Sequence, residues 1–383
     1  MDTRKIFGFA FGPITSAALG LITLPLTAWV FTPADVGRLN IFQVMLSFGL
    51  LFTVLGLDQA YVREYHESDD KGHLLASCFM PGFGLLLGLM AVSAFFAKDL
   101  AWLLFAETNP WLIWLSLVAL AASFVSRFLS LILRMEERGW AYSASQVLPQ
   151  VIRIILIVGL AMSSFSRSFG HLLLIALTSI LAVVMLYGWN TRHQIKDALR
   201  KGLSKAKLKL VLAYGIPLIF SGIAYWGLSS TAILTLRSFS SLEELAVYSV
   251  ANSFAQAAVI FQSIFTVVWS PVVYKWVAQG VDMKVVDRVA QQALAIVCGL
   301  MALFGSLAWL SDWLLPHSYI TVKYIAPCMM LCPLLYTLSA ITCVGINIQR
   351  RTILSLWATL GALLANMVLC WALVPRYGAA GAA

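Results

Sequence analysis

Charged residues are scarce in this chain. Only 11% of its 383 residues are Asp, Glu, Lys or Arg, whereas 61% are hydrophobic. A soluble domain is typically about 25% charged and about 45–50% apolar. A water-soluble fold cannot cover so much apolar surface, and the composition therefore predicts a membrane protein.

Groups that support metal binding, ATP hydrolysis or proton transfer are also few. The six cysteines all fall within long apolar runs, namely Cys78, Cys298, Cys328, Cys332, Cys343 and Cys370. Disulfide frameworks and metal clusters are not normally built there, and Cys328 and Cys332, one helical turn apart, have no His or carboxylate beside them. The sequence has no Gly-x-x-x-x-Gly-Lys phosphate loop, and no Asp, Glu or His lies deep in an apolar run as a proton relay requires. We expect no metal and no cofactor, and the driving force stays open.

Eleven apolar stretches are long enough to cross a bilayer core, which needs about 20 helical residues. Because backbone amides in hydrocarbon must be satisfied internally, these stretches are predicted to be helices. They are residues 6–31, 39–60, 74–97, 111–133, 142–163, 171–189, 210–236, 247–270, 289–310, 324–344 and 352–374. The sequence thus predicts an all-α polytopic membrane protein. Its last residues, 376–383, look like the start of a twelfth span, and we expect the protein to continue past Ala383.

Basic residues alternate between rich and poor connections. With the N-terminus in the cytoplasm, the cytoplasmic connections hold 18 of the 26 Lys and Arg, the opposite ones hold six, and Arg127 and Arg153 lie within spans. Lys and Arg in short loops stay on the cytoplasmic side, so this predicts a bacterial cytoplasmic membrane protein with its N-terminus inside. The net charge of +9 then follows from topology, and no nucleic-acid partner is expected.

The chain reads as a duplication. The most basic connection, residues 191–209, divides it into a six-span half, 1–190, and a half with five visible spans, 210–383. Shifting the first half forward by 209 residues superposes three polar residues of an apolar helix, placing Asn40, Gln43 and Ser47 on Ser249, Asn252 and Gln256. The first helix of each half also carries Gly and Pro, at Gly12-Pro13 and Pro25 and at Gly215 and Pro217, and is predicted to be interrupted there. Parallel repeats and matched breaks are typical of transporters with a central substrate site.

Two arginines lie inside predicted spans. Arg153 is eleven residues from the cytoplasmic end of its span, about 16 Å, and Gln146 and Gln150 share its helix face. Arg127 is six residues from its end, about 9 Å, and can reach the interface. Two interpretations of Arg153 stay open. It pairs with Asp58 of a neighbouring helix, or it forms a cationic cavity wall that binds phosphate or sugar-acid groups.

The order of several short motifs resembles the polysaccharide-unit flippases, especially the O-antigen (Wzx-type) branch, of the multidrug/oligosaccharidyl-lipid/polysaccharide exporter superfamily. These motifs are LPL at 24–26, TPADVG at 32–37, GLDQAYVREY at 56–65, LR at 133–134 with Tyr142, YGIPL at 214–218, YSV at 248–250, WSP at 269–271 and VPRYG at 374–378. Each is degenerate alone, but their order and spacing together are fairly specific, and the resemblance covers essentially the whole chain.

The resemblance implies a fold and a function. In similar proteins two six-helix bundles form a V around a cationic cavity, which receives an undecaprenyl-pyrophosphate-linked oligosaccharide and flips it outward. It thus implies a transporter and not an enzyme, membrane lipids and the lipid-linked oligosaccharide as ligands, and a polysaccharide polymerase and a chain-length regulator as possible partners. Many relatives carry an Arg where this sequence has Thr27-Ala28-Trp29. Arg153, Arg127 and Arg63 would then supply the positive charge.

The candidate substrate-binding residues are Arg153, Arg127, Gln150, Gln146, Asn252, Gln256, Asp58 and Arg63. Two other functions stay open. A drug/cation antiporter of the same superfamily needs a deep Asp or Glu, and a membrane O-antigen polymerase or glycosyltransferase needs catalytic groups on substantial outer loops.

Overall fold

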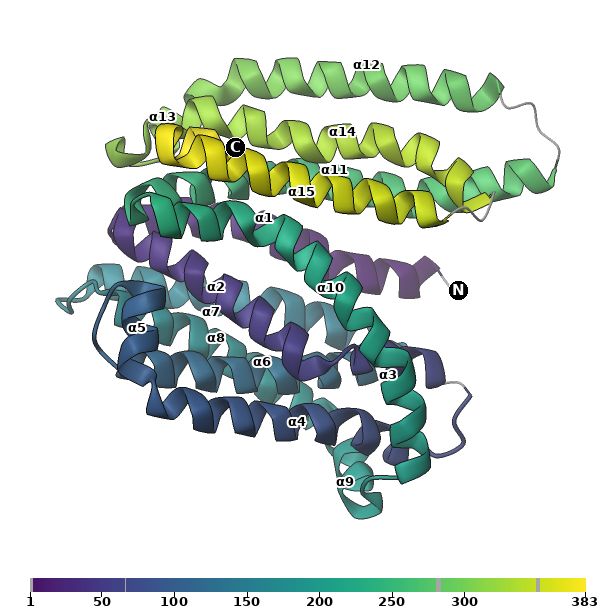
Figure 1. The fold of residues 1–383 in the computed structure, drawn as a ribbon. Coiled ribbons are helices and arrows are strands. Elements are labelled where there is room, and N and C mark those ends of the chain that lie inside the picture. Colours follow the sequence, from purple (N-terminus) through teal and green to yellow (C-terminus); the bar gives the residue numbers. More distant parts are fainter. Residues whose placement is uncertain (1–2, 66, 280–283, 349–351) are drawn as a thin grey trace. The chain divides into compact units, whose positions relative to one another are not determined.

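The computed structural model describes residues 3–65, 67–279, 284–348 and 352–383, and this part of the chain is helical throughout apart from short turns (Figure 1). The long helices are α1 (Thr3–Val30), α2 (Pro33–Val54), α4 (Lys71–Phe95), α6 (Trp111–Met135), α7 (Gly139–Met162), α8 (Phe169–Asn190), α10 (Lys205–Phe239), α11 (Leu242–Ala278), α12 (Lys284–Leu307), α14 (Val322–Ile348) and α15 (Thr352–Tyr377). The short helices are α3 (Leu57–Glu64), α5 (Ala97–Phe105), α9 (Arg192–Lys201), α13 (Ser311–Leu314) and α16 (Ala379–Ala382), with single 3-10 turns at Ala308–Leu310 and His317–Tyr319. Eleven segments of the described chain are long and apolar enough to span a membrane. The predicted all-α polytopic membrane fold is confirmed.

The chain separates into two compact units. The first comprises Met1–Leu19 and Arg38–Ser230, and the second comprises Gly20–Gly37 and Thr231–Ala383. α1 and α10 therefore each run from one unit into the other. These units are not bounded as the predicted halves 1–190 and 210–383 are, and the duplication itself stays a prediction.

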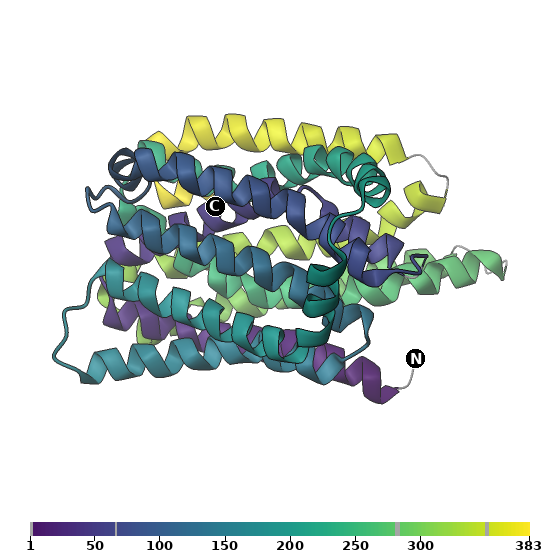
Figure 2. The ribbon, with the colours of Figure 1, turned by 90° about the horizontal axis from the view of Figure 1, so that it is seen from below.

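Within the first unit, α6 is the central helix. It packs against α8, α4 and α7, and these long helices lie side by side in both views (Figures 1 and 2). Large apolar side chains from α3, α4 and α6 fill the space between them, including the fully buried Leu57, Tyr61, Phe124 and Phe128. This packing fixes which face of each helix points inward.

The predicted interruptions of the first helix of each half are wrong. α1 continues through Gly12, Pro13 and Pro25, and α10 continues through Gly215 and Pro217, each as one helix. A proline removes a single backbone hydrogen bond, and membrane helices tolerate that loss where neighbouring groups satisfy the freed carbonyl.

The second predicted span, 39–60, ends earlier than expected. α2 stops at Val54 because Leu55 and Gly56 adopt left-handed backbone angles, with φ of 57° and 66°, and α3 begins at Leu57. Glycine is required at position 56, since a Cβ there would lie 2.6 Å from the Gly215 carbonyl oxygen. Asp58 is consequently outside the span, and its predicted place within one is wrong.

Local capping explains where α2 begins. The Asp35 backbone N–H donates to Thr32 Oγ1 at 3.2 Å, and the Thr32 hydroxyl donates to Asp35 Oδ2 at 2.7 Å. Pro33 occupies the first helical position, where its missing N–H is harmless. The Thr-Pro-Ala-Asp segment is therefore a helix start, and it buries the Asp35 carboxylate that the sequence placed in a loop.

Candidate functional site

α7 carries a continuous stripe of residues three or four positions apart. Ser143, Gln146, Gln150, Arg153 and Ile157 follow one another on the same face. Ser143 and Ile157 are buried, and the three residues between them are half-buried. Arg153 therefore projects from the inner face of α7.

Packing at the start of this stripe shows that it faces a neighbouring helix. The Gly12 backbone N–H of α1 donates to Ser143 Oγ at 2.9 Å. The contact is close enough that a Cβ at Gly12 would lie 2.5 Å from the Ser143 Cα. By contrast, Val151, Ile155 and Val158 on the other side of α7 are exposed, as suits a surface in contact with acyl chains.

Arg153 lies near the middle of α7. It is fourteen residues after Gly139 and nine before Met162, about 21 Å and about 14 Å at the helical rise. These distances exceed comfortable snorkelling, so the guanidinium must meet water, a partner or a ligand within the protein.

Two polar atoms on this stripe are buried without a partner. Arg153 Nε and Gln150 Oε1 are inaccessible and form no hydrogen bond. Among the described residues, Arg153 also forms no ion pair with a carboxylate. An unmade hydrogen bond of a buried group costs about 1–3 kcal/mol, and more for a charged one. The stripe therefore holds a donor and an acceptor that the fold itself leaves unused.

Asp58 pairs with Arg127 and not with Arg153. Arg127 Nη2 lies 2.6 Å and Nε 3.1 Å from Asp58 Oδ2. The other carboxylate oxygen accepts the Gln59 backbone N–H at 2.9 Å, at the start of α3. The interpretation in which Arg153 pairs with Asp58 is therefore wrong, because the carboxylate turns toward α6.

The remaining candidates lie apart from this stripe. Arg63, on α3, stacks over the Tyr214 ring with 4.7 Å from its Cζ to the ring centroid, and its Nε is 3.7 Å from Glu64. Asn252 and Gln256 belong to α11 in the second unit, where Asn252 is half-buried and Gln256 is exposed. The structure thus gathers Gln146, Gln150 and Arg153 on one face, and joins Arg127 with Asp58.

Sequence reasoning treated residues 191–209 only as a basic linker and missed helix α9. Its signal is the apolar spacing of Ile195, Ala198 and Leu199 among charged residues. A polar hollow of about 250 Å³ lies at its start, lined by Arg138, Trp189, Asn190, Arg192, His193 and Gln194. An apolar cavity of about 130 Å³ lies between α9 and helices α4 and α6.

Together, the eleven candidate spans of the described residues and the half-buried arginine at mid-helix define a polytopic helical membrane protein. The fold is similar to that of a solved "Lipid II flippase MurJ, inward closed conformation", with a TM-score of 0.72 and 15% identity over 98% of this chain and 83% of that chain. It is also similar to an inward-facing multidrug resistance MATE family transporter of the MOP superfamily, with a TM-score of 0.65 and 16% identity over 96% of this chain and 89% of that one. At these identities the likeness establishes the fold alone.

The family follows from the sequence comparison. The family of polysaccharide biosynthesis proteins matches residues 3–277, and the chain belongs to this family. The predicted resemblance to polysaccharide exporters is confirmed. Comparison with curated proteins gives no match.

Proposed function

We propose that this protein flips an undecaprenyl-pyrophosphate-linked oligosaccharide repeat unit across the bacterial cytoplasmic membrane, for O-antigen or related polysaccharide synthesis. Membership of the polysaccharide biosynthesis family supports this role, as does a fold shared with a lipid II flippase. A cytoplasmic N-terminus is part of the same proposal.

One observation carries the proposal. Arg153 is held at mid-span on an inward-facing stripe, and its Nε and the adjacent Gln150 Oε1 lack partners. Holding a guanidinium at mid-span without a counter-ion is unfavourable, and a ligand that supplies an anion would offset this cost. A pyrophosphate or a sugar acid supplies the oxyanions that guanidinium binds in bidentate fashion, and a sugar hydroxyl can donate to Gln150.

Translocation does not require these residues to make or break a covalent bond. The lipid tail of such a substrate can stay in the bilayer, while the charged head group has to be shielded from hydrocarbon as it crosses. An arginine and two glutamines on one helix face lower that barrier by replacing water around the oxyanion and the hydroxyls. We assign Arg153, Gln150 and Gln146 on α7 to this contact. Asn252 and Gln256, on α11, are further residues proposed to bind the substrate. A polymerase and a chain-length regulator are the proposed partners downstream.

The two other functions are disfavoured by what each requires. The carboxylates within the described candidate spans lie within a few residues of their ends, as Asp35, Glu243, Glu244, Asp287 and Asp312 do. A cation-coupled antiporter needs one near the middle. A polymerase or glycosyltransferase needs catalytic groups on sizeable outer loops, but the connection from α7 to α8 spans only residues 163–168.

A deletion strain tests the function directly. We expect lipid-linked repeat units to accumulate on the inner leaflet when the gene is removed, and export to return with the wild-type chain. Normal export in the deletion strain would reject the proposal. Extrusion of a cationic dye driven by an ion gradient, without any effect on lipid-linked sugars, would favour the antiporter.

Variants of Arg153 test the site. We expect Arg153→Gln to weaken head-group binding roughly 10- to 150-fold, because charge-assisted hydrogen bonds contribute about 1.5–3 kcal/mol. Arg153→Lys should be intermediate, since it keeps the charge and loses the bidentate geometry. Arg167→Gln is the charge-matched control, because Arg167 is exposed in the connection between α7 and α8. Full export by Arg153→Gln at normal protein level, or equal loss in Arg167→Gln, would contradict the assignment.

A further inference from the structure

Helix α9 lies across the ends of the helices beside it and is held at both of its own ends. Near its start, Gln194 Nε2 donates to Glu136 Oε1 at 2.5 Å, just after α6. At its end, Lys201 Nζ lies 3.0 Å from Asp70 Oδ1, at the start of α4. α9 therefore bridges the ends of α6 and α4 that lie on one side of the membrane.

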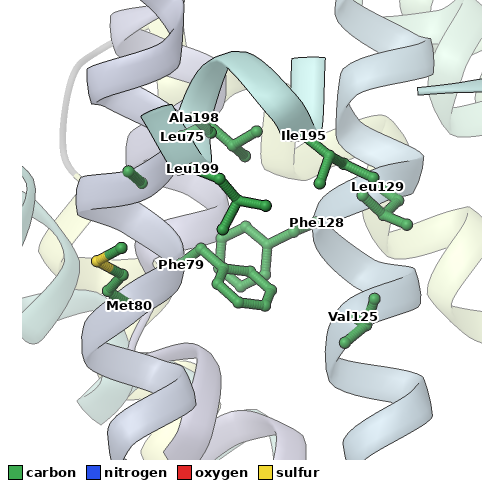
Figure 3. Close-up of a pocket in the computed structure, with 10 residues that line it drawn as sticks. Leu75, Phe79, Met80, Val125, Phe128, Leu129, Ile195, Ala198 and Leu199 are labelled. Carbon is green, nitrogen blue, oxygen red and sulfur yellow. The ribbon is translucent and has the colours of Figure 1, made fainter. Parts of the chain in front are cut away.

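The cavity under α9 is entirely apolar. It measures about 130 Å³ and is lined by Leu75, Ala76, Phe79, Met80, Val125, Phe128, Leu129, Ile195, Ala198 and Leu199. Figure 3 shows Ile195 and Leu199 of α9 above the rings of Phe79 and Phe128, with α4 and α6 on either side. The two rings meet edge to face at 5.5 Å between centroids.

The rim of this cavity stays open although it is apolar. Leu199 is 71% exposed and Met80 is 38% exposed. The two side chains form an apolar surface beside the charged side of α9, and a helix with one apolar and one charged side lies in the membrane interface.

A row of cations lies beside the rim. Arg192, Lys196 and Arg200 are four residues apart on α9, so they share one face next to Ile195 and Leu199. All three are exposed, and none forms an ion pair with a carboxylate of the described residues. Arg192 instead stacks on the exposed Trp189 ring, 5.0 Å from its centroid, and tryptophan favours the membrane interface.

We propose that an anionic glycerophospholipid binds at α9, with one acyl chain entering the cavity and its phosphate against Arg192, Lys196 and Arg200. The apolar lining fits hydrocarbon, and the unpaired cations fit a phosphate at the depth where α9 lies. A membrane phospholipid is the occupant, and not the lipid-linked substrate, because the site lies under α9, between α4 and α6. Arg153 instead lies near the middle of α7. The bound lipid fastens α9, the connection between α8 and α10, to the bilayer.

Photolabelling of the full chain in vesicles tests this site. The probe is phosphatidylglycerol with a photoreactive group in one acyl chain, diluted into phosphatidylcholine vesicles. We expect labelled peptides to contain residues 75–80, 125–129 and 195–199, and the same group on phosphatidylcholine to label them less. Lys196→Gln/Arg200→Gln should lower the apparent affinity for phosphatidylglycerol roughly 30-fold, which corresponds to about 1 kcal/mol for each cation near an anionic surface.

A matched pair of substitutions provides the control. Lys205→Gln/Lys209→Gln removes the same charge from exposed positions of α10 that do not line the cavity, and should leave the labelling unchanged. Equal loss in both pairs, equal labelling by both lipids, or labelling spread evenly over the outer helices would overturn the proposal. Displacement of the label by added lipid-linked pyrophosphate would assign the cavity to the substrate and would likewise overturn it. Because both pairs are exposed, unchanged thermal unfolding in neutral lipid verifies that each variant is folded.

Discussion

Asp58 and Arg127 form an ion pair whose two side chains differ in exposure. This difference predicts how the stability of the protein responds when each residue is mutated. The Asp58 side chain is 8% exposed, whereas that of Arg127 is 46% exposed. Arg127→Gln leaves an almost fully buried carboxylate without its cation. Asp58→Asn leaves a guanidinium that can turn to solvent, and it keeps the acceptor for the Gln59 amide.

These exposures set the magnitudes. Removing one partner of a fully buried pair costs about 3–5 kcal/mol, and solvent screening at the half-exposed arginine reduces this, so we expect about 2–3 kcal/mol for Arg127→Gln. Asp58→Asn should cost about 1 kcal/mol or less. The double variant should be less destabilised than the sum of the two, with a coupling of about 1–2 kcal/mol.

Equilibrium unfolding of the purified protein in mixed detergent micelles measures all three variants. Export assays on the same variants show whether Arg127 also touches the substrate. Equal or greater destabilisation by Asp58→Asn would refute the reasoning from exposure. Unchanged stability of Arg127→Gln together with lost export would return Arg127 to the binding site.

Two further predictions concern the residues that precede α3 and α4, Gly56 and Asp70. The Lys201 ammonium holds the pKa of Asp70 at about 2, below its ordinary 3.8, so the stability contributed by this contact is complete above about pH 4 and is lost as the pH falls through 2. The difference in melting temperature between wild type and Asp70→Asn should be constant above that range and shrink below it; a constant difference at every pH would contradict the assignment. Gly56→Ala should destabilise the protein by at least about 1–2 kcal/mol, because its φ is 66° and a Cβ would lie 2.6 Å from the Gly215 oxygen. Gly84→Ala, in α4 with no atom near the added Cβ, should be neutral or stabilising in the same unfolding assay, and equal effects of the two would be inconsistent with this account.

The spans were predictable because hydrocarbon leaves a chain few choices. A run of about 20 apolar residues must be helical to satisfy its own amides, so composition alone located the eleven helices. The end of α2 was less predictable. It depends on left-handed backbone at Leu55 and Gly56, in a turn that Gly215 approaches so closely that a Cβ at Gly56 would lie 2.6 Å from the Gly215 carbonyl oxygen. That approach joins residues about 160 positions apart and leaves no local signal.

The sequence predicted which face of α7 carries the polar residues, but not which arginine pairs with Asp58. Heptad-like spacing from Ser143 to Ile157 placed Gln146, Gln150 and Arg153 on one face, and the burial of both ends of the stripe agrees. Which arginine meets Asp58 depended on the rotation of α6 and on the turn before α3. The position of each arginine along its span, counted from the sequence, does not show how its helix is rotated. The choice between Arg127 and Arg153 therefore required the three-dimensional structure.

The pairing of Asp58 changes what Arg153 implies about the protein. Once Arg127 takes this carboxylate, no acid of the described residues offsets the desolvation of Arg153, and Gln150 does not satisfy its Nε. Removing a half-buried charge that has no counter-ion relieves a desolvation penalty instead of breaking an ion pair. The Arg153→Gln variant should therefore unfold no earlier than wild type while it loses export, as expected of a residue kept for a ligand at the expense of stability. Loss of both stability and export would instead make Arg153 a structural residue, and the transport role assigned to α7 would then lose its support.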